Sequence, residues 1–109
     1  MVQTPPLREP TYFVLAALAP GPAHGYRIIQ TIKELSDGRV TVRAGTLYAA
    51  LDRLERDGYI ELVGTETGDG PPRRSFTLTA AGRDLLAGEV ARLHANVEVG
   101  RASLRHAAP

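Results

Sequence analysis

The chain has 109 residues, which fits a single domain, with 43% hydrophobic and 23% charged residues and a formal net charge of +1. Because the net charge is close to zero, any basic surface must be local. The absence of cysteine excludes disulfides, thiol catalysis and thiolate zinc sites. No run of about 18 apolar residues could cross a membrane, and residues 1–8 lack the pattern of a signal peptide, so we expect a cytoplasmic protein with no membrane partner.

The N-terminal third of the chain predicts a lead-in and two helices. Residues 1–10 contain three prolines and little apolar content, which favours a disordered lead-in. Residues 11–18 are almost wholly apolar; their length fits a strand or a helix, and their Ala-Ala-Leu sequence favours a buried helix that ends at 19–22. Residues 24–35 show the apolar spacing of an amphipathic helix, and Gly38 ends it.

A third helix is predicted just after a short strand or extended link at residues 39–42. Residues 43–57 carry apolar side chains at helical spacing, and Gly58 stands where a C-terminal glycine cap belongs. The inward residues are Leu47, Leu51 and Leu54.

Two β-prone runs, residues 59–65 and 76–78, predict a hairpin. Residues 66–72, which separate them, are dense in glycine and proline. That composition predicts a long loop at the tip of the hairpin.

The last predicted helix is long. Thr79 provides an N-cap, and no proline interrupts the chain as far as Leu104, which gives about 39 Å of helix. Its apolar or small residues recur at steps of three and four, close to a heptad seam. They are Gly82, Leu86, Val90, Leu93, Val97, Gly100 and Leu104. Because such a helix overshoots the rest of the domain, its exposed seam indicates an interface.

The order of elements predicts a mainly α fold with a small β-hairpin. Residues 11–78 would form a winged helix-turn-helix, and residues 79–109 a C-terminal dimerisation helix and tail. In a winged helix-turn-helix that binds DNA, the second helix of the pair enters the major groove.

Several stretches resemble the PadR-like family of transcriptional regulators. The run GTLYAALDRLERDGYI at 45–60 resembles the family signature, and HGY at 24–26 resembles the start of its second helix. The run RRSFTLTAAG at 73–82 resembles its wing strand and the entry to its last helix, and EVARL at 89–93 fits that helix. The resemblance implies a dimeric, cytoplasmic, DNA-binding repressor of the short branch, in which the first and last helices of two protomers pack together.

Two positions depart from the family pattern. Ser75 stands where an aromatic residue is common, while Phe76 keeps the neighbouring one. Relatives often carry serine or proline just before the GTLY run, but residues 42–44 read VRA, so Thr41 is the nearest residue that could cap the helix. How this helix starts, and which backbone groups face phosphate, is therefore open.

Seven residues are candidate DNA contacts on this arrangement. They are Tyr26, Arg43, Thr46, Tyr48, Arg53, Arg73 and Arg74. Thr46 and Arg53 lie on the helix face away from the leucines, and Arg43 can reach a phosphate or a guanine edge. Tyr26 lies near a helix N-terminus, where phosphate is favoured.

Four of these candidates have a structural alternative. Tyr48 packs against the hairpin or contacts phosphate, and Arg53 contacts DNA or pairs with Asp57 at i+4. The arginines at 73 and 74 clamp DNA or form a charged strand end beside the acidic Glu66 and Asp69. For His24, capping of its helix is favoured over pH sensing.

The predicted dimer interface draws on the first and last helices. It comprises Tyr12, Phe13, Leu86, Val90, Leu93, Val97 and Leu104. A small-molecule effector between the protomers is possible but unidentified. Because residues 79–109 contain no aromatic residue, we expect a planar aromatic effector to bind weakly or not at all.

No constellation of catalytic, cofactor-binding or metal-binding residues is visible. The histidines lie far apart in sequence, none of the three serines sits in a nucleophile elbow, and Gly68-Asp69-Gly70 lacks the lysine of a phosphate loop. We therefore expect no enzyme and no cofactor. The leading hypothesis is a homodimeric regulator that binds an inverted-repeat operator in double-stranded DNA. The alternative is a winged-helix module that binds another protein and no DNA, which the near-zero charge favours.

Overall fold

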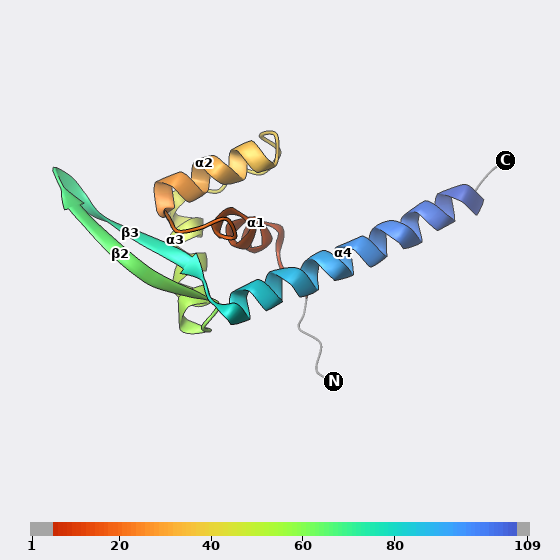
Figure 1. The fold of residues 1–109 in the computed structure, drawn as a ribbon. Helices are drawn as coiled ribbons and strands as arrows, with labels where there is room; N and C mark the ends of the chain where they lie inside the picture. The colour runs from red at the N-terminus through yellow and green to blue at the C-terminus, as the bar shows by residue number, and fades with distance from the viewer. Residues whose placement is uncertain (1–5, 107–109) are drawn as a thin grey trace.

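The computed structural model describes residues 6–106, which form four helices and a three-stranded antiparallel sheet (Figure 1). The helices are α1 (Glu9–Leu18), α2 (Gly25–Leu35), α3 (Ala44–Arg56) and α4 (Ala80–His106). The strands are β1 (Ala23–His24), β2 (Ile60–Gly68) and β3 (Gly70–Leu78), in the sheet order β1-β3-β2. The predicted fold, a winged helix-turn-helix with a long last helix, is confirmed.

Helix α1 begins at Glu9, inside the predicted lead-in. Pro10 lies in the first turn, where backbone N–H groups make no hydrogen bond within the helix, so the missing N–H of proline costs nothing there. Glu9 places a negative charge at the positive end of the helix dipole. Residues 1–5 of the predicted lead-in and residues 107–109 of the predicted tail lie outside the described residues.

The core lies between α1, α2, α3 and the base of the hairpin. All three predicted inward leucines of α3 are buried there. They meet side chains from the other elements that are also buried. These are Val14, Leu15, Leu18, Ile28, Ile32, Val40, Val42, Ile60, Phe76 and Leu78.

The link between α2 and α3 is extended and has no strand pairing, which decides between the two predicted alternatives. It is fastened by the buried Ser36 at the end of α2. The Ser36 hydroxyl donates to the carbonyl of Ile32 at 2.8 Å and accepts from the amide of Val40 at 3.0 Å. This fastening fixes where the chain turns toward α3.

The helix ends show which capping predictions hold. His24 is the N-cap of α2, and its Nδ1 accepts from the Arg27 amide at 3.3 Å, so the capping interpretation is confirmed. Thr41 does not cap α3. The N-cap there is Arg43, two residues after Thr41, because the extended link continues past Thr41. The side chain of Arg43 makes no capping hydrogen bond. At the other end of α3, Gly58 has φ of +83° and the Tyr59 amide donates to the carbonyl of Leu54, as a glycine cap requires.

The hairpin has no long loop at its tip, so that prediction was wrong. β2 continues to Gly68 and β3 starts at Gly70, which leaves Asp69 alone at the turn. The prolines of the tip lie in β3 where it pairs with β2 only, and an edge position tolerates them. Each strand of nine residues spans about 30 Å, so the hairpin is a long wing.

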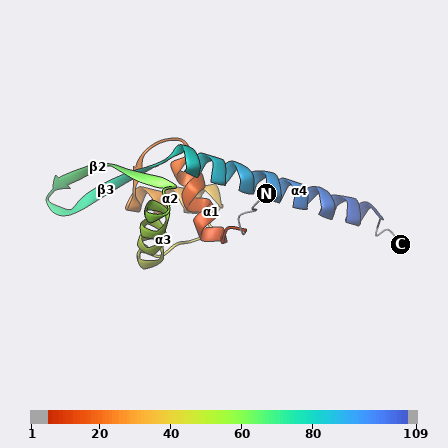
Figure 2. The ribbon, with the colours of Figure 1, turned by 90° about the horizontal axis from the view of Figure 1, so that it is seen from below.

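Helix α4 and the wing project from opposite ends of the body (Figure 1, Figure 2). The extents of the chain are 63 × 34 × 22 Å and its radius of gyration is 16.4 Å. A compact chain of this length would have a radius of gyration of about 13 Å. The excess reflects the distal part of α4, which passes beyond α1, and the wing.

The start of α4 is fixed by two contacts with the segment between α3 and β2. The predicted N-cap Thr79 is confirmed: its hydroxyl accepts from the Gly82 amide at 3.1 Å and donates to the Gly58 carbonyl at 2.6 Å. Gly82 lies directly against the backbone carbonyl of Tyr59, where a Cβ would collide. Gly82 therefore permits the close approach of α4 to the body.

Replacement of Gly82 by alanine is expected to destabilise the protein by about 1 to 3 kcal/mol, because the added methyl group overpacks against the Tyr59 carbonyl. Gly88→Ala is the matched control on the same helix. A Cβ at position 88 would point into open space, with no packed neighbour within 4 Å, so helix propensity should stabilise the protein by about 0.5 to 1 kcal/mol. Urea unfolding of both variants measures the sign of each change in the free energy of unfolding. A gain in stability for both would contradict the packing of α4 on Tyr59.

Candidate nucleic-acid interface

Helix α3 has one face in solvent, opposite its buried leucines. Gly45 and Ala49 lie in the middle of this face, and both are exposed. Helical geometry places Tyr48 on one edge and Thr46 and Arg53 on the other. Asp52 and Arg56 lie on the same face in the later turns, and both are exposed. A ligand surface can therefore approach the α3 backbone closely at the first two turns, where the middle residues are small. α3 lies behind the base of the hairpin in Figure 1 and projects below that base in Figure 2.

The Tyr48 edge of α3 borders a hollow that we call the wing-side hollow. Its lining residues are His24, Gly25, Tyr26, Tyr48, Pro71, Pro72, Arg73 and Arg74. The ring of Tyr48 lies over Gly25, so close that a Cβ there would be 2.8 Å from the tyrosine hydroxyl. Tyr48 still keeps 51% of its surface exposed. The ring of Tyr48 therefore packs on α2, whereas the predicted alternative was packing against the hairpin, and its exposed surface leaves room for a phosphate contact.

Four of the seven predicted contacts, Tyr26, Tyr48, Arg73 and Arg74, meet at the wing-side hollow. The guanidinium of Arg74 pairs with Glu55 at 3.5 Å and lies 5.1 Å from the centre of the Phe76 ring. Because an exposed pair of this kind contributes little to stability, Arg74 can exchange Glu55 for another anion. Arg73 is exposed and lies opposite Glu66 in the β2–β3 register.

The opposite edge of α3 borders a second hollow, the α1-side hollow. It is lined by Arg8, Pro10, Thr11, Gly45, Thr46, Ala49, Ala50 and Arg53. The predicted contacts Thr46 and Arg53 therefore lie apart from the wing-side group, across the small middle of α3. The alternative ion pair of Arg53 with Asp57 does not form among the residues that the structure describes.

Arg43 stands at the N-terminus of α3 with an exposed side chain. The first amides of α3 have no helical partner and no side-chain cap, so this end favours an anion. Sequence reasoning missed two exposed arginines near α3, Arg8 and Arg56. Arg56 lies seven residues after Ala49, so the helical spacing used for the other candidates could have found it. No local pattern signals Arg8, because a different element carries it.

The predicted dimer residues form a stripe along α1 and α4. Leu86 packs partly on the core, whereas Val90, Leu93, Val97 and Leu104 are exposed. The rings of Tyr12 and Phe13 meet edge to face, with centroids 5.5 Å apart. A third hollow, between α1 and α4, is lined by Leu7, Glu9, Tyr12, Phe13, Arg39, Glu89, Arg92 and Leu93.

Residues 6–106 hold no group of three or more metal-ligating side chains. Over the same residues, no helix is long and apolar enough to cross a membrane.

The family model described as "Transcriptional regulator PadR-like family" matches residues 14–88. A Streptomyces fradiae protein described as an uncharacterized 37.1 kDa protein in transposon TN4556 is 45% identical over 76 residues, which are 70% of this chain. The matched part is 20% of the length of that relative.

Solved structures share the fold. A PadR family transcriptional regulator from Eggerthella lenta matches with a TM-score of 0.70 and 28% identity, over 90% of this chain and 82% of that one. Bacillus subtilis PadR, crystallised in complex with operator DNA, matches with a TM-score of 0.66 and 28% identity. That match covers 75% of this chain and 46% of the Bacillus chain.

Proposed function

Because the chain belongs to the PadR-like family of transcriptional regulators, we propose that it is a homodimeric repressor that binds an inverted-repeat operator in double-stranded DNA. Members of this family are regulators and not enzymes, which agrees with the sequence-based expectation. The observation that carries the proposal is the exposed face of α3, which is small in its first two turns and has arginines beside both of its edges. The operator complex of Bacillus subtilis PadR supports it.

The proposed docking places α3 in the major groove. Gly45 and Ala49 let the helix backbone approach the bases, while Thr46 and Arg53 reach base edges, where an arginine can pair with guanine through two hydrogen bonds. Arg43 contacts a phosphate or a guanine next to the first turn of α3. These residues supply sequence discrimination.

The wing-side hollow would receive the sugar-phosphate backbone at one border of the groove. Tyr26 lies at the start of α2, where the helix dipole favours phosphate. Arg73 and Arg74 extend this contact along the wing toward the neighbouring minor groove. Contacts of this kind fix the position of α3 and carry no sequence information directly.

The proposed dimer buries the stripe on α1 and α4. Three aliphatic side chains, Val90, Leu93 and Val97, stand exposed on one side of a helix that passes beyond the body. A stripe of this kind on a soluble chain marks an interface. A two-fold dimer presents two copies of α3, which is why we propose an inverted repeat. Residues 11–78 then bind DNA and residues 79–109 dimerise.

Repression follows from occupancy, because a dimer on its operator excludes other proteins from the same DNA. We propose that this takes place in the cytoplasm. A small-molecule effector stays a prediction. We propose that an effector would bind in the hollow between α1 and α4. The aromatic residues that line this hollow are Tyr12 and Phe13. We still expect planar aromatic molecules to bind weakly or not at all.

Binding to a protein in place of DNA is the second candidate. The net charge of +1 and the acidic residues Glu66 and Asp69 near the wing tip favour it. Salt dependence separates the two candidates, because phosphate contacts release counterions and most protein contacts do not.

The affinity for a random-sequence duplex pool is expected to fall steeply as salt rises. Three arginine–phosphate contacts per protomer, from Arg43, Arg73 and Arg74, give a slope of about −5 for the log affinity of the dimer against log salt concentration. Fluorescence anisotropy of a labelled duplex pool measures this slope. A folded dimer that binds no duplex at low salt, or binds with a flat slope, would favour the protein-binding module instead.

A further inference from the structure

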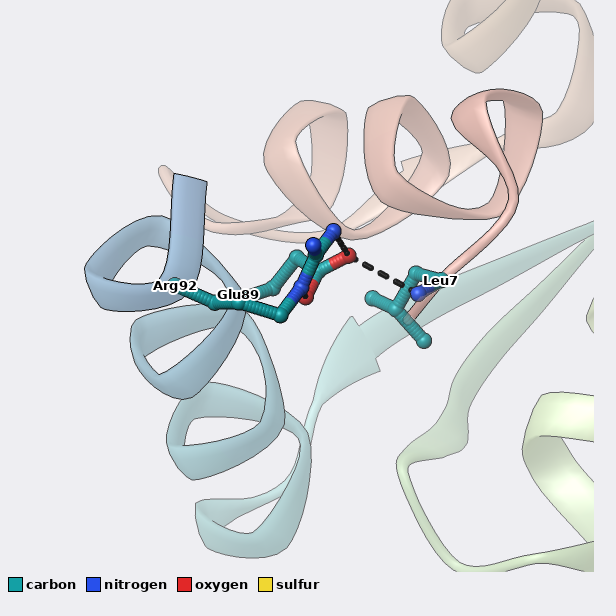
Figure 3. A network of polar contacts seen from close by, with 3 residues as sticks. All are labelled: Leu7, Glu89 and Arg92. Atoms are coloured by element: carbon teal, nitrogen blue, oxygen red, sulfur yellow. Dashed lines mark hydrogen bonds and ion pairs between the residues drawn. The ribbon is translucent and has the colours of Figure 1, made fainter. Parts of the chain in front are cut away.

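The segment before α1 is tied to α4 across the fold. The amide of Leu7 donates to Oε2 of Glu89 at 2.8 Å (Figure 3). Arg92 holds the same carboxylate from the other side, through Nε to Oε1 at 2.7 Å and Nη2 to Oε2 at 2.9 Å. Glu89 is only 7% exposed, so both of its oxygens are used within the fold.

The ionised form of Glu89 is favoured at this place. The hydrogen bonds from Arg92 lower the pKa of the Glu89 carboxyl, and the Leu7 amide and the charge of Arg92 lower it further. Burial acts in the opposite direction, but the net shift of this pKa is downward. The side chain of Leu7 adds to the anchor, because it packs against the core. The chain is therefore held at Leu7 before α1 begins.

The residue that follows the anchor is Arg8. It is the N-cap of α1, with extended backbone angles of φ −67° and ψ 148°, and its side chain is exposed. Arg8 lines the α1-side hollow together with Thr46, Ala49 and Arg53 of α3. An arginine from outside the helix-turn-helix thus stands on the edge of α3 that faces away from the wing.

This position matches the second border of the major groove. A major groove about 12 Å wide has a phosphate backbone on each side. On the docking proposed above, the wing-side residues Tyr26, Arg73 and Arg74 meet one backbone. The other border needs cations on the opposite edge of α3, and Arg8 is placed there beside Arg53.

We propose that Arg8 contacts the DNA backbone at the border of the major groove away from the wing, and that Glu89 is the positioning residue that holds Arg8 there through Leu7. The inference rests on the proposed function. The guanidinium of Arg8 donates to phosphate oxygens, a contact that is geometrically specific but carries no sequence information.

The variant Arg8→Gln tests the contact. Its affinity for a random-sequence duplex pool should fall about threefold to tenfold, and the salt slope should shrink by about 0.9 per protomer. The loss should be equal for a duplex that carries an operator obtained by selection from the same pool, so the ratio of specific to non-specific affinity stays unchanged. Arg105→Gln is the matched control, because it removes the same charge from an exposed position far along α4 and should leave both values unchanged.

The two possible failures are distinguishable. If the unchanged protein binds no duplex, the proposed function fails. If it binds with a steep salt slope and Arg8→Gln binds identically, only the role of Arg8 is overturned.

Two substitutions of Glu89 test positioning. Glu89→Met removes the acceptor for the Leu7 amide. The affinity of this variant for the duplex pool should fall nearly as far as that of Arg8→Gln. Glu89→Gln keeps an amide oxygen that can accept from Leu7, so it should restore most of the affinity. In the Arg8→Gln background, Glu89→Met should cause no further loss. A further loss of affinity of the same size, or light scattering that shows the Glu89→Met protein to be monomeric, would mean that Glu89 supports α4. Either result would overturn the role of Glu89 in positioning Arg8.

Discussion

Replacing Val97 by aspartate is expected to turn the proposed dimer into a folded monomer and to lower affinity for DNA by about 100-fold or more. Val97 lies on the stripe of α4 beyond the body, and 49% of its surface is exposed in the protomer. The substitution therefore leaves the core intact. In a two-fold dimer it places two carboxylates in an apolar interface, where desolvation and like-charge repulsion cost several kcal/mol. Each lost factor of ten in affinity corresponds to about 1.4 kcal/mol.

Val99→Asp is the matched control. Val99 lies two residues away on the same helix, is 66% exposed, and points to a different side from the stripe. Its substitution should leave the molar mass and the affinity for DNA unchanged. Light scattering and anisotropy at the same protein concentration measure both properties. A Val97→Asp protein that remains dimeric would place the interface elsewhere on the chain.

Replacing Ala49 by glutamate is expected to weaken DNA binding to a similar degree, by about 100-fold. Ala49 lies in the middle of the exposed α3 face, between the wing-side and α1-side arginines. A carboxylate there faces the base edges and nearby phosphates, and like charges juxtaposed at an interface cost several kcal/mol. Because Ala49 is exposed, the substitution should change the free energy of unfolding by less than about 0.5 kcal/mol.

Two controls separate charge from bulk in this experiment. Ala49→Gln has nearly the same size without the charge, so it should lose less affinity than Ala49→Glu. Ala91→Glu adds the same charge to an exposed position of α4 away from the stripe, and should change affinity little. If Ala49→Glu and Ala91→Glu bind alike, another surface contacts DNA.

The parts of the fold with local sequence signals were predictable. Apolar spacing identified α2, α3 and α4, and His24, Gly58 and Thr79 marked helix ends whose capping bonds the structure contains. These signals arise from interactions within a few residues, so a single sequence displays them. The exposed stripe of α4 followed from its length.

The errors arose where local preference yielded to the fold. Glycine and proline at the wing tip indicated a loop, but pairing with β2 extended β3 to Gly70. Thr41 had the chemistry of a cap, but the extended link with its buried valines starts α3 after Arg43.

Long-range contacts could not be predicted from the sequence. The hydrogen bond between Leu7 and Glu89 joins residues 82 positions apart, and no local pattern at either residue indicates the contact. Arg8 enters the candidate interface only because that bond and α1 bring it beside Arg53. Similarly, the division of the predicted contacts into two edges of α3 required the positions of α1 and the wing.

Selection of binding sites from a random duplex pool, at low and at moderate salt, tests most directly whether this chain reads DNA as a homodimer. We predict enrichment of an inverted repeat whose half-sites lie about 10 base pairs apart, since two copies of α3 would enter successive major grooves. No enrichment from a folded, dimeric protein at either salt concentration would contradict sequence-specific recognition by α3.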